Sequence, residues 1–453
     1  MFLSLPPACQ PKKLLVFVSR ALHLAYCIVI YPFPIIIQIH ISIVTMVSST
    51  DFKYRYLSKD GIQALKDFQY NGADHSLIYK YILSPIAGFL VDNATPSTIA
   101  PNAITLFGFS FMIASFMLMA SHCPTLDHCG AQNEVPSYIF LFNGIATLVY
   151  QTLDNMDGKQ ARKTGSSSPL GLLFDHGLDA WNILVGTVNT LCLLAIGSDD
   201  FFCLAAVSFS TAAAFYVATW EEYHTHKMVL PIINGPTEGV LVTATLSFTS
   251  WWKGRQFWHE YGMYEIVEPF LPTLVKDMVS GQFPPGMMAN KDLLAFFIAF
   301  MAVREVVAKI LFVVRKHGLK SVTGLIPLSA LMIMSVLIVQ SNPRVFLENQ
   351  RITLSLFGII FVEMTTGLML DHMTRRTFDP FRNTLVPIFI LYCVVDLEVL
   401  SMEHISLYLM ICTAGLSSLL ILKTKIVIAE ICNSLGIWVF DITTPHPNSK
   451  KSQ

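Results

Sequence analysis

The chain has 453 residues, of which 53% are hydrophobic and only 13% are charged. This balance excludes an ordinary soluble protein of that length. The net charge of −1 excludes the basic surface that nucleic-acid binding requires, so we expect no nucleic-acid partner. Apolar stretches of helix length recur without strand-like alternation, and backbone groups in lipid need internal hydrogen bonds. We therefore predict an all-α, polytopic integral membrane helical bundle.

The first 100 residues divide into two parts. Residues 1–45 form an apolar extension that is interrupted by Arg20, His23 and a proline pair, which fits neither a clear signal peptide nor a clear span. Met46 begins a polar stretch and offers an alternative start. Residues 46–100 mix apolar and charged side chains, and we predict an amphipathic helix on the membrane surface there, with a turn at 70–76.

Roughly ten transmembrane helices follow, by the usual length and hydropathy criteria. Between the fifth and sixth windows, residues 253–291 are polar and aromatic, and we predict an interfacial loop there. The windows are Ile104–Ala120, Tyr138–Leu153, Trp181–Ile196, Phe201–Thr219, Gly239–Trp252, Leu293–Val314, Leu325–Val339, Ile352–Leu370, Leu385–Leu400 and Ile405–Leu422.

Four aspartates stand between the second and third windows, where a membrane protein can least accommodate them. Asp154 and Asp157 are spaced i, i+3, and Asp175 and Asp179 are spaced i, i+4, so each pair shares one helical face. The turn residues 164–169 can fold the second helix back beside the first. Because ionisable groups at membrane depth are costly and mostly functional, we predict that the four carboxylates converge on one site.

Converging carboxylates repel one another unless cations neutralise them. Oxygen-only ligation favours Mg²⁺ or Mn²⁺, with Ca²⁺ as the alternative, and four carboxylates suit two ions that hold a pyrophosphate. Gly158, Ala161 and Gly171 leave room for a phosphate or nucleotide close to the backbone. The Arg162 guanidinium is a bidentate partner for phosphate.

These residues match the pattern D-x2-D-G-x2-A-R-x8-G-x3-D-x3-D at every fixed position. The chain thereby resembles the CDP-alcohol phosphotransferase family, and in particular its eukaryotic choline/ethanolamine phosphotransferase branch. The segments that carry the second resemblance are Tyr70–Ser76, Pro101–Asn102, Gly158–Arg162, Ser166–Gly171, Leu173–Gly177, Thr219–Glu221 and Asn234–Pro236.

The resemblance implies an enzyme that transfers phosphocholine, phosphoethanolamine or both from CDP-choline or CDP-ethanolamine to the hydroxyl of diacylglycerol in the membrane, releasing CMP. It implies that residues 101–225 form the catalytic core, followed by C-terminal transmembrane helices over 226–430 and a cytosolic tail over 431–453. It is also compatible with a homodimer. The choice between choline and ethanolamine stays open.

By the same resemblance, the four aspartates would hold two Mg²⁺ or Mn²⁺ ions. The residues that would contact substrate are Asn102, Gly158, Ala161, Arg162 and Gly171. A helix cap is the alternative role for Asn102.

The attacking hydroxyl needs a base, and carboxylates clamped on cations are poor bases. His176 is the preferred candidate because an imidazole titrates near neutrality, and Asp179 is the alternative. In the eukaryotic branch a glutamate commonly precedes this histidine by one turn, whereas this chain has Leu172. That departure leaves the imidazole without the expected partner.

Two further readings concern function class and location. A cation-coupled transporter would also bury carboxylates in a helical bundle, but it does not require Ala161, Arg162 and Gly171 at their positions.

The ending Lys450-Lys451-Ser452-Gln453 resembles a dilysine retrieval signal, so we expect the endoplasmic reticulum membrane, with the Golgi as the alternative. Cys123 and Cys129 flank a short loop that could form a disulfide, bind zinc or do neither.

Overall fold

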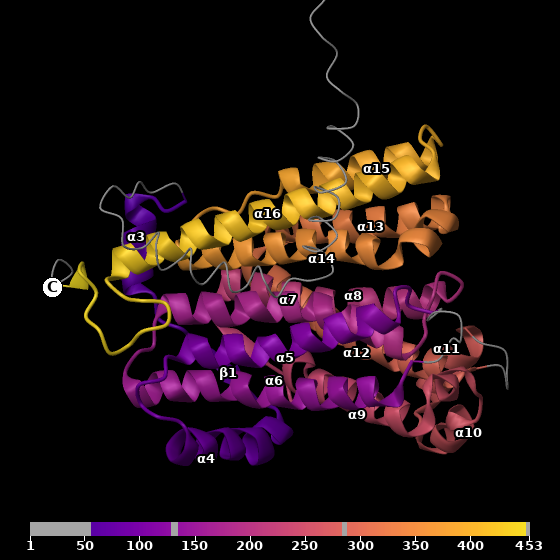
Figure 1. Ribbon diagram of the computed structural model, residues 1–453, viewed down its shortest axis with the longest axis horizontal. Helices are drawn as coiled ribbons and strands as arrows, with labels where there is room; N and C mark the ends of the chain where they lie inside the picture. The colour runs from indigo at the N-terminus through magenta and orange to yellow at the C-terminus, as the bar shows by residue number, and fades with distance from the viewer. Residues whose placement is uncertain (1–55, 128–134, 283–287, 450–453) are drawn as a thin grey trace, which may run out of the picture.

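The computed structural model describes residues 56–127, 135–282 and 288–449. The N-terminal extension 1–45 and the dilysine at 450–451 lie outside these residues. The long helices run side by side as one bundle, with α4 along one edge and α15 and α16 along the other (Figure 1). Their bounds are α5 Pro101–His122, α6 Ser137–Thr164, α7 Pro169–Leu193, α8 Phe201–Thr225, α9 Val240–Lys253, α12 Asn290–His317, α13 Ile326–Ser341, α14 Pro343–Met373, α15 Val386–Asp396 and α16 Met402–Leu435.

The all-α prediction is confirmed, since each of the predicted windows overlaps one of these helices. Within the described ranges, five helical segments are long and apolar enough to cross a membrane, and α15 belongs to a shorter apolar segment. The five segments are Pro101–His122, Phe201–Thr225, Leu319–Ser341, Pro343–Met373 and Met402–Leu435. The chain is thus a multi-pass membrane protein.

Two apolar cores hold the bundle together. One packs α5, α6, α7 and α8 around buried residues such as Met119, Phe140 and Leu191. The other packs α8, α13, α14, α15 and α16. The helix α7 contributes to both cores, so the segment that carries two of the four aspartates is packed on several sides.

The region before α5 differs from the single surface helix predicted for it. It forms α3 Lys59–Asp67, the strand β1 Gly72–Asp74, a π-helical turn over Tyr79–Leu83 and α4 Ser84–Ala94. The helix α3 is amphipathic, burying Ala64 and Leu65, and lies against the ends of α14 and α16 (Figure 1).

The turn predicted over residues 70–76 is wrong for Gly72–Asp74, because these residues pair in parallel with the strand β2 Met228–Leu230. The Asp74 carboxylate explains the pairing, since it accepts hydrogen bonds from Ser76 N, Asn234 Nδ2 and Thr237 Oγ1 at 2.8, 3.1 and 3.1 Å.

The predicted loop over 253–291 is also more ordered than expected. It contains the short helices η3 Arg255–His259, α10 Met263–Val267, η4 Glu268–Phe270 and α11 Thr273–Gln282. A small apolar core around Val279 and Phe296 explains their order. They lie at the end of the bundle opposite α3 (Figure 1).

Candidate active site

The connection between α6 and α7 folds the two aspartate-bearing segments back on each other. The helix α6 ends at Gly165, whose φ of +65° is left-handed, as glycine C-caps commonly are. Three residues later, Ser168 caps α7, since its hydroxyl accepts a hydrogen bond from Gly171 N at 3.1 Å. Pro169 occupies the first turn, where its missing N–H costs nothing. The predicted hairpin is therefore present.

Three of the four predicted carboxylates meet between these helices. One oxygen each from Asp154, Asp157 and Asp175 lies within 4.8 Å of the others. Asp154 Oδ1 and Asp175 Oδ1 are buried and have no hydrogen-bond partner in the part of the chain described. Unpartnered buried carboxylate oxygens at this spacing are strongly unfavourable without a cation, and an all-oxygen donor set fits a hard divalent ion. These residues therefore fit the ions that the family resemblance implies.

The fourth aspartate is held by a tyrosine. Asp179 Oδ1 accepts a hydrogen bond of 2.5 Å from the Tyr150 hydroxyl on α6. On the other side of the cluster, the Thr105 hydroxyl on α5 donates to Asp157 Oδ2, also at 2.5 Å. The sequence reasoning missed both donors. Their only sequence signal is spacing, since Tyr150 precedes Asp154 by one helical turn and Thr105 follows Asn102 by three residues.

Three polar side chains of the aspartate motif anchor α6 to α4 and to the chain that follows it. Lys159 Nζ donates to Ser84 Oγ at 2.9 Å, and Lys163 Nζ donates to the Val91 carbonyl at 2.5 Å. Gln160 Nε2 donates to the carbonyls of Pro96 and Ile99 at 3.0 and 2.9 Å. These contacts fix the polar end of α6 and explain why charged residues follow the aspartates.

The predicted substrate residues lie at this same end of the bundle. Gly158 and Arg162 are one turn apart on α6, and a Cβ on Gly158 would lie 3.5 Å from Arg162 Nη1. The Arg162 side chain is exposed and forms no hydrogen bond or ion pair with any of the described residues. Ala161 is half-buried beside it. An exposed guanidinium above a residue without a side chain suits an incoming phosphate.

Asn102 does not cap a helix, because the N-cap of α5 is Ala100. Its Nδ2 instead donates to the Val439 carbonyl at 2.9 Å and so ties the C-terminal tail to α5. Its Oδ1 faces Gly171, where an added Cβ would lie 3.7 Å away. The cap alternative is therefore wrong, and Asn102 is placed beside the start of α7.

His176 lies next to Asp175 on α7, with its ring edge-on to Tyr70 at a centroid distance of 6.1 Å. Neither ring nitrogen forms a hydrogen bond with any residue that the structure describes. Leu172, one turn earlier, cannot supply one. The expectation that this imidazole lacks a tautomer-fixing partner agrees with the structure.

A polar cavity of about 230 Å³ lies beside Tyr70 and is formed by the segment around α3 together with α8 and α14. Its lining includes Phe68, the buried carboxyl of Glu222, and His226 and His372, whose rings are stacked at 5.2 Å. The preceding residue, Glu221, is instead paired with Lys309.

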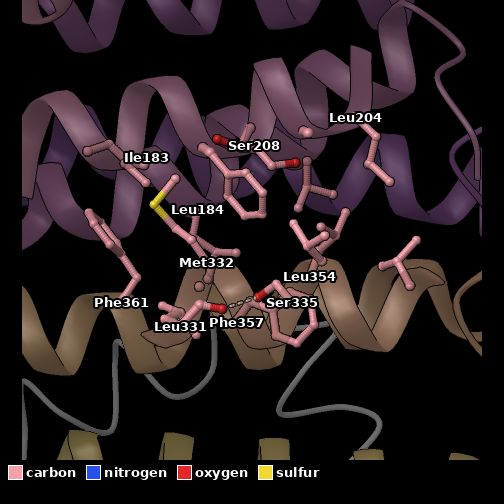
Figure 2. A pocket seen from close by; sticks show the side chains of 18 of the residues that line it. Ile183, Leu184, Leu204, Ser208, Leu331, Met332, Ser335, Leu354, Phe357 and Phe361 are labelled. Carbon is pink, nitrogen blue, oxygen red and sulfur yellow. Dashed lines mark hydrogen bonds between the residues drawn. The ribbon is translucent and has the colours of Figure 1, made fainter. Parts of the chain in front are cut away.

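A second cavity is apolar and lies between α7, α8, α13 and α14. Figure 2 shows Ile183 and Leu184 of α7 facing Phe357 and Phe361 of α14 across it. Ile183 follows Asp179 by one helical turn, so this cavity begins just below the carboxylates.

At the far end of α5, Cys123 forms a disulfide. Its partner lies outside the described residues. The predicted alternative, a disulfide that closes this loop through Cys129, falls on a residue outside the described ones.

Residues 98–263 match the model of the CDP-alcohol phosphatidyltransferase family. The chain is 28% identical to a CDP-alcohol phosphatidyltransferase class-I family protein of Dictyostelium discoideum over 86% of this chain and 99% of that one. It is 38% identical to choline/ethanolaminephosphotransferase 2 of Arabidopsis thaliana over 45% and 50% of the two chains. It is 28% identical to human ethanolaminephosphotransferase 1 over 78% and 87%. The matched region, residues 98–263, includes the α6–α7 hairpin with all four aspartates, so this part of the chain is a CDP-alcohol phosphatidyltransferase domain.

Proposed function

We propose that this protein transfers phosphocholine, phosphoethanolamine or both from the matching CDP-alcohol to diacylglycerol, making a phospholipid and releasing CMP. The observation that carries the proposal is the carboxylate cluster of Asp154, Asp157 and Asp175, which has two buried unpartnered oxygens and lies within the matched domain. The transporter alternative accounts for buried acids but not for this domain or for relatives named as phosphotransferases.

Each part of the site has a role in this reaction. Asp154, Asp157, Asp175 and Asp179 would hold divalent ions, which when bound neutralise the diphosphate and stabilise the leaving CMP. The exposed Arg162 guanidinium binds a phosphate oxygen, and Gly158 and Gly171 keep side chains out of its path. The chain's own contribution is thus to orient the diphosphate and to exclude water from it.

His176 accepts the proton of the attacking diacylglycerol hydroxyl in this proposal. A neutral imidazole can take that proton, whereas the carboxylates are committed to cations. Tyr70 covers one edge of the ring. Because the imidazole has no carboxylate partner, we expect a slower reaction than in an enzyme with a glutamate at the Leu172 position.

The acceptor reaches the site from the lipid. The apolar cavity lined by Ile183 has a volume of about 80 Å³, and we assign it to a short part of a diacylglycerol acyl chain (Figure 2). A diacylglycerol held there presents its hydroxyl near the carboxylates without leaving the apolar phase.

The Cys123 disulfide supports a cytosolic site. Disulfides persist in oxidising compartments, so the end of α5 at Cys123 would face the lumen. Thr105, which contacts Asp157, lies eighteen residues earlier on α5, or about 27 Å away along the helix. The carboxylates would therefore open to the cytosol, as expected for an enzyme of the endoplasmic reticulum or Golgi membrane that uses a soluble nucleotide substrate.

The decisive experiment is CMP release by the purified full chain in lipid nanodiscs that contain diacylglycerol. CDP-choline and CDP-ethanolamine are supplied separately and in competition, with Mg²⁺, with Mn²⁺ or with a chelator. We expect metal-dependent CMP release with at least one CDP-alcohol and a phospholipid product of matching headgroup. Ion uptake without CMP release would support the transporter instead.

A further inference from the structure

Two buried hydroxyls donate to aspartates of the site, one to the clustered Asp157 and one to Asp179 one turn beyond Asp175, and each joins a different pair of helices. Thr105 of α5 donates to Asp157 of α6, and Tyr150 of α6 donates to Asp179 of α7, both at 2.5 Å. Thr105 and Tyr150 are each only 2% exposed. A buried hydroxyl that donates to a carboxylate forms one of the stronger hydrogen bonds in proteins.

The two bonds divide the four aspartates into two kinds. Asp157 and Asp179, one from each helix of the hairpin, have one oxygen occupied by a hydroxyl. Asp154 and Asp175, again one from each helix, keep a buried oxygen with no partner among the described residues. A carboxylate with one oxygen held by a hydroxyl keeps one rotamer, which directs its remaining oxygen elsewhere.

We propose that Thr105 and Tyr150 are positioning residues for divalent-cation binding: they tie Asp157 and Asp179 so that one oxygen of each carboxylate is left for a cation. This inference rests on the proposed function only in taking the cluster to be a cation site. It assigns no contact with substrate to either hydroxyl. Groups that hydrogen-bond metal ligands in this way typically change metal affinity by 10–100-fold when removed.

The chain offers matched controls for both hydroxyls. Tyr216 on α8 is fully buried, and its hydroxyl donates to the Gly324 carbonyl at 3.0 Å, away from the carboxylates. Thr147 on α6 is 2% exposed and donates to the Asn143 carbonyl at 2.8 Å. Tyr216→Phe and Thr147→Val therefore remove the same groups from equally buried positions without touching an aspartate.

The test measures Mn²⁺ binding to the purified full-length protein without substrate, by the loss of the free-ion signal in electron paramagnetic resonance. We expect Tyr150→Phe and Thr105→Val to weaken Mn²⁺ binding about 10-fold or more. Thr105→Ser, which keeps the hydroxyl, should stay close to wild type, as should both controls. The Mg²⁺ concentration for half-maximal CMP release should rise in the same two variants.

Wild-type Mn²⁺ affinity in both Tyr150→Phe and Thr105→Val would overturn the inference. So would equal losses in the controls, which would indicate a general packing effect. Size-exclusion profiles establish that each variant folds, and the Val/Ser pair at position 105 gives a result even if Tyr150→Phe does not fold. Because the titration uses no CDP-alcohol, failure of the proposed transfer reaction would show as Mn²⁺ binding without CMP release. A wild-type protein that binds no Mn²⁺ would overturn both proposals.

Discussion

Replacing Asp175 with asparagine should make the metal-free protein more stable while abolishing its activity. The oxygens of Asp154, Asp157 and Asp175 lie within 4.8 Å of one another. With an effective dielectric constant of about 20, each ionised pair at that distance repels by about 3.5 kcal/mol. The substitution Asp175→Asn removes two such pairs, or about 7 kcal/mol of repulsion, at nearly constant side-chain volume.

Only part of that repulsion will appear as stability, because the cluster can take up protons in the absence of metal. We expect about 1 to 2 kcal/mol of net stabilisation, since replacing buried charges is often stabilising by such amounts. That corresponds to a rise of a few degrees in the unfolding midpoint. Activity should fall by at least about 100-fold. Removing a group that hydrogen-bonds a metal ligand already lowers activity by about 10–100-fold, and Asp175→Asn removes a predicted ligand itself.

The assay compares thermal unfolding midpoints in detergent with a chelator and with saturating Mg²⁺, alongside CMP release. The wild type should be stabilised by Mg²⁺, and Asp175→Asn should gain little from it. Asp92→Asn, which neutralises an exposed acid on α4, is the control and should behave as wild type. An Asp175→Asn protein with an unchanged metal-free midpoint and substantial turnover would refute the electrostatic reasoning.

Further perturbations test three separate parts of the structure: the base, a buried ion pair and the C-terminal tail. His176→Gln should lower kcat by about 10²–10⁴-fold while leaving Mn²⁺ affinity near wild type, and Leu172→Glu should raise kcat by giving the imidazole a partner. Lys309→Met should lower the free energy of unfolding by about 3–5 kcal/mol, because it leaves the buried Glu221 carboxylate unpaired. The double variant Lys309→Met/Glu221→Gln should recover much of the lost stability, as measured by thermal unfolding. Burial holds the pKa of His446 below its ordinary value. Packing of the C-terminal tail should therefore weaken as the pH falls below about 6.5. The measurement is the rate of proteolysis of residues 436–449, which should increase at low pH.

Each of these predictions has a contrary outcome. A His176→Gln enzyme with wild-type kcat would move the base elsewhere, with Asp179 as the next candidate. If Lys309→Met is as stable as wild type, the buried pair contributes no net stability. The sign of the pH effect follows from the lowered pKa, since the released tail binds the proton more tightly than the packed tail does. Equal proteolysis at pH 5.5 and 7.5 would exclude that coupling.

The sequence alone was enough to predict that lipid surrounds most of this chain and that four aspartates form its reactive site. Apolar segments of helix length have one stable arrangement in lipid, so the helical bundle followed from composition and backbone hydrogen bonding. The spacing of Asp154, Asp157, Asp175 and Asp179 placed each pair on one helical face, and Gly165 and Ser168 marked the turn between the helices. These are local properties, which depend on neighbours within about two turns.

What sequence could not supply are contacts between segments far apart in the chain. Gly72–Asp74 looked like a turn because its residue types favour one, but Asp74 bonds to Asn234 and Thr237, and a strand results. For Asn102 the cap was the alternative role, but its amide binds the Val439 carbonyl, 337 residues away. In both cases a polar side chain forms a hydrogen bond with a residue far away in the chain. Residue-type preferences, which are local, do not predict such a bond.

The same distinction applies within the site. Sequence placed the aspartates together but did not distinguish among them, because helical spacing says only which residues share a face. The tertiary structure decided that Thr105 bonds Asp157 and Tyr150 bonds Asp179, and that Asp154 and Asp175 keep an unpartnered oxygen. Which carboxylates are tied depends on where α5 and α7 pack against α6. That packing is set by the apolar cores. The difference between the hydrogen-bonded and the unpartnered carboxylate oxygens therefore arises only in the folded bundle.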